Sequence, residues 1–113
     1  MDESNPWKTL DRRVVYDNPW IQVSQHQVIQ PEGAKGIYGV VHMKNVATGV
    51  VPIDDDGFTW LVGQWRYTLN EYSWEIPEGG GDPGGPSLEA VQRELLEETG
   101  LQASEWHFLQ EIH

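Results

Sequence analysis

Three glutamates near the end of the sequence, Glu94, Glu97 and Glu98, have the spacing of neighbours on a helix. Carboxylates held that close repel one another and raise one another's pKa, and a bound cation would relieve the repulsion. Carboxylate oxygens, with further positions left for water and phosphate oxygens, suit Mg²⁺ or Mn²⁺ better than zinc. We therefore expect this segment to hold a divalent metal ion against a phosphorylated substrate.

The helix that must position these glutamates is predicted over Leu88–Thr99. The Ser87 hydroxyl can cap its N-terminus, and Gly100 can adopt the left-handed conformation that ends a helix. The apolar stripe at helical spacing consists of Leu88, Val91 and Leu95. We expect this stripe to be the buried face.

The glutamates lie to one side of the predicted buried face. At 3.6 residues per turn, Glu98 is about 50° from the centre of the stripe, Glu94 about 90° and Glu97 about 150°. Arg93 precedes Glu97 by four residues and can hydrogen-bond it, which would fix its rotamer and cancel one charge. Glu94 and Glu98 are therefore the first candidates for metal ligands, and Glu97 is a further ligand or a base.

A helix with this charge pattern could also be only a solvated acidic face, since such faces are common. The residues upstream favour a functional interpretation. The turn containing Glu75, Pro77 and Gly79, followed by the segment Arg93–Leu101, resembles the Nudix box. This box is the loop-helix-loop of hydrolases that cleave nucleoside diphosphates linked to another moiety, and the resemblance spans residues 79–101.

The resemblance implies a fold, a cofactor and a set of roles. The fold would be of the α/β (α+β) class, a Nudix-type α/β/α sandwich with a mixed sheet. Mg²⁺, with Mn²⁺ as the alternative, would activate water for attack on a diphosphate. The catalytic residues would be Arg93, Glu94, Glu97 and Glu98, and the metal ligands Glu94, Glu98 and Glu97. Arg93 would orient Glu97, and the Gly79 loop would shape the site.

One position departs from the family pattern. The family has a glutamate six residues after the first glycine of the box, where this sequence has Gly85. In the family that glutamate mostly supports the loop and can assist with metal. The departure therefore bears on loop rigidity and on full activity, while the core metal ligands remain.

A second resemblance covers most of the chain. Segments 15–23, 62–67 and 74–77 are similar to the ADP-ribose pyrophosphatase branch of the family, and nucleotide-sugar hydrolases share these motifs. In that branch a strand-rich N-terminal arm builds a dimer and often exchanges between subunits. We therefore expect a homodimer through the arm, and ADP-ribose or a related nucleotide sugar as the substrate.

The same resemblance predicts residues that bind the substrate. Arg66 stands where this branch places an arginine on a substrate phosphate, a role that a bidentate guanidinium suits. The structural alternative for Arg66 is pairing with Glu71 or Glu75. Among the tryptophans, most of which we expect in core or dimer contacts, Trp20 and Trp74 are the candidates for stacking on an adenine or sugar. The predicted substrate-binding set is Arg66, Trp74, Glu75, Gly79 and Trp20.

Strand and turn patterns divide the chain into an N-terminal arm, residues 1–44, and a core, residues 45–113. In the arm, alternating apolar and polar residues predict antiparallel strands over 12–16, 20–29 and 36–43. In the core we expect a hairpin of 46–53 with 58–67, and a single strand over 106–112. The acidic turn 54–57 is predicted to be a plain turn, because its aspartates are adjacent instead of alternating as in a calcium loop.

Composition excludes several classes of protein. The sequence has 113 residues and no cysteine, which excludes disulfides, thiolate zinc sites and cysteine nucleophiles. A formal net charge of -11 opposes binding to a nucleic-acid backbone. The N-terminus is acidic and polar without an apolar stretch, so we expect no signal peptide, no membrane span and a cytoplasmic location.

Thirteen residues follow Gly100, whereas the family fold continues with further strands, a last helix and a loop that in several members carries another ligand or the base. We expect these C-terminal elements to be missing. The alternative to a hydrolase is a shortened Nudix-like module that binds metal and nucleotide, or mediates assembly, with little turnover. Gly85 and the early C-terminus favour this alternative.

Overall fold

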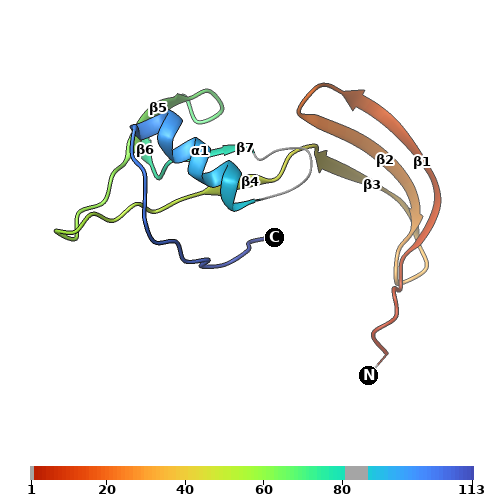
Figure 1. Ribbon diagram of the computed structural model, residues 1–113. Helices are drawn as coiled ribbons and strands as arrows, with labels where there is room; N and C mark the ends of the chain where they lie inside the picture. Colours follow the sequence, from red (N-terminus) through yellow and green to blue (C-terminus); the bar gives the residue numbers. More distant parts are fainter. Residues whose placement is uncertain (1, 81–86) are drawn as a thin grey trace. The chain divides into compact units, whose positions relative to one another are not determined.

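The computed structural model describes residues 2–80 and 87–113, so Gly85 lies outside the described residues. The chain divides into two compact units, Met1–Lys44 and Asn45–His113. In the described residues, the first unit contains three long strands, and the second contains four short strands and one helix (Figure 1).

The first unit is an antiparallel sheet with the strand order β1-β2-β3. Its strands are β1 (Lys8–Asp17), β2 (Ile21–Ile29) and β3 (Lys35–Met43), which confirms the three strands predicted for the arm. The β1–β2 turn is closed by Asn18, whose Oδ1 accepts hydrogen bonds of 2.8 Å from the backbone N–H groups of Trp20 and Ile21.

The register of this sheet gathers apolar side chains on one face. Directly paired residues of antiparallel strands project to the same side. The cross-strand pairs are Tyr16 with Val23, Val23 with Val41, and Ile21 with Met43. In the described part of this unit, Val28 is the one buried residue, and the sheet therefore covers little of its own apolar surface.

The second unit pairs its strands differently from the prediction. β4 (Ala47–Gly49) pairs with β7 (Glu78–Gly80), and β5 (Val62–Arg66) pairs with β6 (Glu71–Glu75). The predicted hairpin of 46–53 with 58–67 is wrong, apart from an isolated bridge between Ile53 and Thr59. One physical reason is Pro52, which has no N–H to donate to a ladder within the apolar run 46–53.

The acidic turn 54–57 has the predicted plain form. Asp54 Oδ1 accepts hydrogen bonds of 2.9 Å from the backbone N–H groups of Asp56 and Phe58. Gly57 has a φ of 83°, the left-handed conformation that glycine adopts without strain. The Asp54 carboxylate is thus occupied in closing the turn.

The helix α1 (Leu88–Thr99) has the predicted bounds and caps. Ser87 Oγ accepts a hydrogen bond of 3.1 Å from the backbone N–H of Ala90. At the other end Gly100 has a φ of 74°, and its N–H donates to the Leu96 carbonyl at 2.8 Å. The helix contacts β7.

The face that α1 buries differs from the predicted stripe. Leu95 is buried as expected, but Leu88 is 54% exposed, whereas Ala90 and Glu94 are buried. The helix is turned so that its small residue and its glutamate, rather than its first leucine, lie inward. Side-chain hydrophobicity alone could not predict this, because a hydrogen-bonded carboxylate can replace an apolar side chain in a contact.

The predicted strand over 106–112 is wrong, since residues 101–113 contain neither helix nor strand. A strand needs a neighbour that completes its backbone hydrogen bonds, and an alternating sequence pattern cannot supply one.

The α+β class is confirmed. The described residues hold a single helix, so they do not include a second helical layer of a three-layer sandwich. In this described part, α1 is too short and too polar to cross a membrane.

Candidate active site

Among the described residues of the second unit, Glu94 is the buried carboxylate, with 8% of its surface exposed. It extends from α1, and its Oε2 accepts a hydrogen bond of 2.7 Å from the Thr48 hydroxyl of β4. A buried charge without such a partner would be strongly destabilising. The hydrogen bond therefore allows a glutamate to occupy a position in the contact between helix and strands.

Gly79 provides the room that this carboxylate needs. A Cβ atom at position 79 would lie 2.6 Å from Glu94 Oε1 and 2.8 Å from its Cδ, which is closer than real contacts allow. In the structure Gly79 belongs to β7 and pairs directly with Thr48 of β4. The glycine thus lets the helix carboxylate approach the strand backbone.

Glu97 and Glu98 lie on the solvent side of the helix. Arg93 and Glu97 form an ion pair, with Arg93 Nε 3.8 Å from Glu97 Oε1, a separation longer than the predicted hydrogen bond, and both side chains are about half exposed or more. Such a pair contributes little to stability. Glu98 is exposed, so the expectation that it lies nearest the buried face is wrong. The turned helix gives that position to Glu94.

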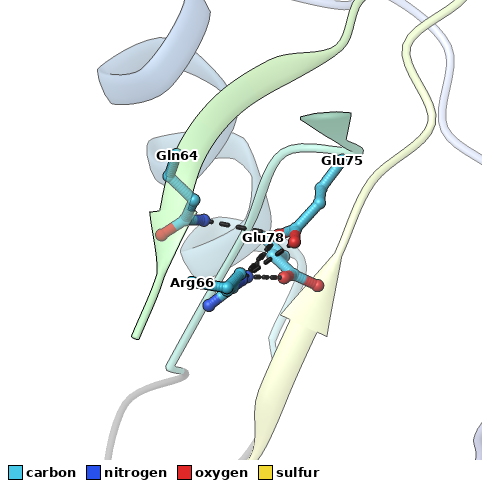
Figure 2. A network of polar contacts seen from close by, with 4 residues as sticks. All are labelled: Gln64, Arg66, Glu75 and Glu78. Carbon is cyan, nitrogen blue, oxygen red and sulfur yellow. Dashed lines mark hydrogen bonds and ion pairs between the residues drawn. The ribbon is translucent and has the colours of Figure 1, made fainter. Parts of the chain in front are cut away.

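Arg66 of β5 contacts carboxylates on two other strands, Glu75 of β6 and Glu78 of β7 (Figure 2). Its Nε donates to the two oxygens of Glu75 at 2.8 and 3.1 Å, and its Nη2 contacts both Glu75 and Glu78. Gln64 adds a long hydrogen bond of 3.4 Å to Glu75. Arg66 therefore has one of its two predicted partners, Glu75, and a second partner, Glu78, that was not predicted.

The two carboxylates that contact Arg66 have pKa values shifted in opposite directions, because different causes dominate at each. The hydrogen bond from Arg66 lowers the pKa of Glu75 to about 2. Burial raises the pKa of Glu78, and the hydrogen bond and charge of Glu75 raise it further. The Arg66 charge opposes this rise in the pKa of Glu78, and the Glu98 charge adds to it.

The two tryptophans predicted to stack on a base or sugar are both open to solvent within their units. Trp20, in the β1–β2 turn of the first unit, is 68% exposed. Trp74, in β6 of the second unit, is 66% exposed and meets Tyr72 edge to face at 5.5 Å between ring centroids. An exposed ring can offer a face to a ligand, so both stay candidates.

Sequence reasoning missed Thr48 and Glu78. Glu78 is next to Gly79, so its place in the box-like turn was visible, but its contact with Arg66 depends on the pairing of the strands. Thr48 had no signal in the sequence. It is 46 residues from Glu94, and the two side chains meet because β4 pairs with β7 while α1 contacts β7.

The side chains at this site fit a hard divalent cation by their chemistry. Within residues 2–80 and 87–113, no three Asp, Glu or His side chains are gathered closely enough to hold a metal ion by themselves. Mg²⁺ is commonly held by one or two carboxylates, with waters and substrate phosphates completing its shell. Glu94 presents an oriented carboxylate of this kind, and Glu98 follows it by one helical turn.

Two family profiles together match nearly the whole chain. The profile of the nucleoside diphosphate sugar hydrolase N-terminal domain matches residues 7–41. The profile of the NUDIX domain matches residues 43–113, which is more than half of the chain. The boundary between the two matches falls beside the boundary between the two units, at Lys44.

Individual relatives cover the chain to different extents. The ADP-ribose pyrophosphatase of Mycobacterium tuberculosis is 34% identical over 112 residues, which cover 94% of this chain and 51% of that protein. An RNA pyrophosphohydrolase of Shewanella baltica is 39% identical over 67 residues, 50% of this chain and 38% of its own length. The chain thus spans about half the length, or less, of these two relatives.

A solved structure shares the fold. The crystal structure of an ADP compounds hydrolase superimposes with a TM-score of 0.80 at 26% sequence identity, over 97% of this chain and 60% of that one. At 97% coverage, the similarity includes residues of both units.

Proposed function

Because the chain belongs to the Nudix family, we propose that it hydrolyses a nucleoside diphosphate linked to another moiety, with Mg²⁺ as cofactor. The observation that supports this most is the Glu94 carboxylate, buried on α1 and held by Thr48 beside Gly79. A buried, oriented carboxylate in the box helix has the chemistry of a metal ligand.

In the proposed reaction, water attacks one phosphorus of the diphosphate and one P–O bond breaks, which gives two phosphate monoesters and, once both are fully ionised, two protons. Bound Mg²⁺ would lower the pKa of water and offset the charge that grows on the phosphoryl oxygens. Glu94 and Glu98 would hold the ion, and Glu97 would act as a further ligand or accept the proton from water. Arg93 would orient Glu97.

Arg66 would bind a substrate phosphate. Its contacts with Glu75 and Glu78 use Nε and Nη2, and a guanidinium has donors on Nη1 as well. Held by two carboxylates, the guanidinium would meet a phosphate without first losing side-chain freedom. Glu75 would thus serve the substrate through Arg66, while Trp74 and Trp20 would stack on the base or sugar.

ADP-ribose or a related nucleotide sugar is the substrate class that the comparisons support best. The ADP-ribose pyrophosphatase covers 94% of the chain, including the arm, whereas the RNA pyrophosphohydrolase covers 50%. The profile matching the arm belongs to nucleoside diphosphate sugar hydrolases. The net charge of -11 also opposes a long nucleic-acid substrate.

The first unit would form a homodimer through its sheet. Tyr16, Val41 and Met43 share one face and are 55%, 58% and 63% exposed. An exposed apolar face on a sheet favours pairing with another copy, and a symmetric dimer is the commonest closed solution. The cytoplasmic location stays a prediction, which fractionation of cells that produce the protein would test.

A substrate panel tests the proposed activity. The purified chain is incubated with Mg²⁺ and ADP-ribose, nucleotide sugars, dinucleoside polyphosphates and a 5′-triphosphorylated RNA, and the nucleotide products are separated. We expect AMP from ADP-ribose, or a nucleoside monophosphate from a nucleotide sugar. Calorimetric binding of ADP-ribose without any product would instead support the shortened binding module, and release of pyrophosphate from RNA would contradict the proposed substrate class.

A further inference from the structure

The two oxygens of Glu94 are contacted by two residues that face each other across one ladder. Thr48 of β4 and Gly79 of β7 are direct cross-strand partners. Thr48 donates its hydroxyl hydrogen to Oε2 at 2.7 Å, and the bare Cα of Gly79 leaves the space that Oε1 occupies. One residue therefore attracts the carboxylate, while the other gives it room.

We propose that Thr48 is a positioning residue for metal binding, acting through Glu94. This inference rests on the proposed function, in which Glu94 is a ligand. The Thr48 hydroxyl holds Oε2 of Glu94 toward the strands. The lone pairs of the Glu94 carboxylate that Thr48 does not use would therefore keep one orientation toward the cation. Groups that hydrogen-bond a ligating carboxylate in this way commonly raise metal affinity by about 10- to 100-fold.

The chemistry of Thr48 matters more than its volume. Valine has nearly the same shape but no hydroxyl, so Thr48→Val would leave Oε2 without its donor while it stays buried. The Glu94 side chain would then turn toward water to recover a hydrogen bond. Serine keeps the hydroxyl and loses only the methyl group, so Thr48→Ser separates positioning from packing.

Thr59 provides the matched control in the same unit. Its hydroxyl donates a hydrogen bond of 2.8 Å to the carbonyl of the buried Pro52, close in length to the 2.7 Å bond of Thr48, although Thr59 itself is exposed and Thr48 is half-buried. Thr59→Val therefore removes a comparable threonine hydrogen bond away from Glu94. Any general loss of stability should appear in both valine variants, whereas loss of metal binding should appear only in Thr48→Val.

The test measures Mn²⁺ binding to the purified chain by the electron paramagnetic resonance signal of free Mn²⁺, with circular dichroism as a check of folding. We expect Thr48→Val to weaken Mn²⁺ binding about tenfold, and Thr48→Ser and Thr59→Val to bind as the unchanged chain does. If Thr48→Val does not fold, Thr48→Ala, which also lacks the hydroxyl but adds no bulk, takes its place.

A second readout distinguishes positioning from packing. Raising Mn²⁺ to saturation should restore the hydrolysis rate of Thr48→Val, since only the affinity has changed. Equal Mn²⁺ affinity of Thr48→Val and Thr59→Val, while Glu94→Gln binds more weakly, would overturn the role of Thr48 and leave the proposed function standing. Unchanged affinity in Glu94→Gln would remove Glu94 as a ligand, and with it both claims.

Discussion

The two units differ in where their order comes from. The first has strands of 10, 9 and 9 residues, yet Val28 is its one buried residue among those described. The second has strands of 3 to 5 residues, yet it buries Ala90 and Leu95 together with the carboxylate of Glu94. Long hydrogen-bonded ladders and a packed interior are thus separate properties.

The difference corresponds to two physical tasks. A sheet whose apolar face is open can bury that face against another copy, and it needs no functional group for this. A site for chemistry needs charged groups held at fixed orientations, which requires closely packed and hydrogen-bonded supports such as Thr48 and Gly79. Our proposal accordingly places assembly in the first unit and chemistry in the second.

Replacing Arg66 should give the largest effect on the chemical unit. Arg66→Gln removes the guanidinium that joins Glu75 and Glu78 and, in our proposal, contacts a substrate phosphate. Removing one preorganised donor of this kind costs about 100-fold in kcat. Steady-state kinetics with ADP-ribose would measure the loss.

Arg66→Lys sharpens this prediction because it keeps the charge without the planar fork. We expect Arg66→Lys to recover only a small part of the rate. A lysine variant as fast as the unchanged chain would contradict a need for the guanidinium geometry, and an unchanged rate in Arg66→Gln would leave Arg66 with a purely structural role.

Substituting the apolar face of the first unit should separate assembly from chemistry. Val41 shares its face with Val23, whereas the neighbouring Val40 pairs with Ser24 on the opposite face. Val41→Asp should raise the dissociation constant of the dimer about tenfold or more, as expected for a residue at the centre of an interface. Val40→Asp should raise it less. Light scattering over a range of concentrations measures both.

A monomeric mass for the unchanged chain at micromolar concentration, with cooperative folding, would refute the dimer. Equal effects of the two aspartate variants would show that the apolar face defined by Tyr16, Val23 and Val41 is not the interface.

The smallest expected effects concern the two carboxylates on Arg66. The pKa of Glu75 is lowered from 4.5 to about 2, so the folded state binds fewer protons than the unfolded state between these values. Its contribution to stability is present above pH 4.5 and is lost as the pH falls toward 2. The pKa of Glu78 is raised, so its ionisation lowers stability as the pH rises above 4.5.

Neutral glutamines should therefore shift the melting temperature in opposite directions near neutral pH. Glu75→Gln should lower it and Glu78→Gln should raise it, and the effect of Glu75→Gln should shrink in acid. Thermal melts at several pH values follow both variants. Shifts of the same sign would contradict the opposite pKa changes.

The local elements of the molecule could be predicted from the sequence, because their signals are local. Ser87 and Gly100 fixed the ends of α1, and alternation located the three strands of the arm. The partners of the short strands could not be predicted. The apolar run 46–53 indicates a buried or paired segment. Its pattern does not indicate whether the pairing partner is β7 or the next strand of a hairpin.

The candidate site divides along the same line. The helix residues Glu94, Glu97 and Glu98 follow from their spacing, and their roles as ligands stay predictions. The orientation of α1 could not be deduced from its apolar stripe, because the contact of Glu94 with Thr48 depends on a pairing between distant segments. The hydrogen-bonded neighbours of a site are thus harder to predict than the site residues themselves.

The central claim is tested most directly by the rate at which AMP is released from ADP-ribose. The rate is measured for Glu94→Gln and Glu89→Gln, once with Mg²⁺ and once with a chelator. Both changes remove one carboxylate from α1, but Glu89 is exposed in the first turn and Glu94 is buried beside Gly79. We predict Mg²⁺-dependent product from the unchanged chain and from Glu89→Gln, and a rate at least about 100-fold lower for Glu94→Gln. Equal rates in the two variants, or product that forms as fast in chelator, would contradict a metal-dependent hydrolase centred on Glu94.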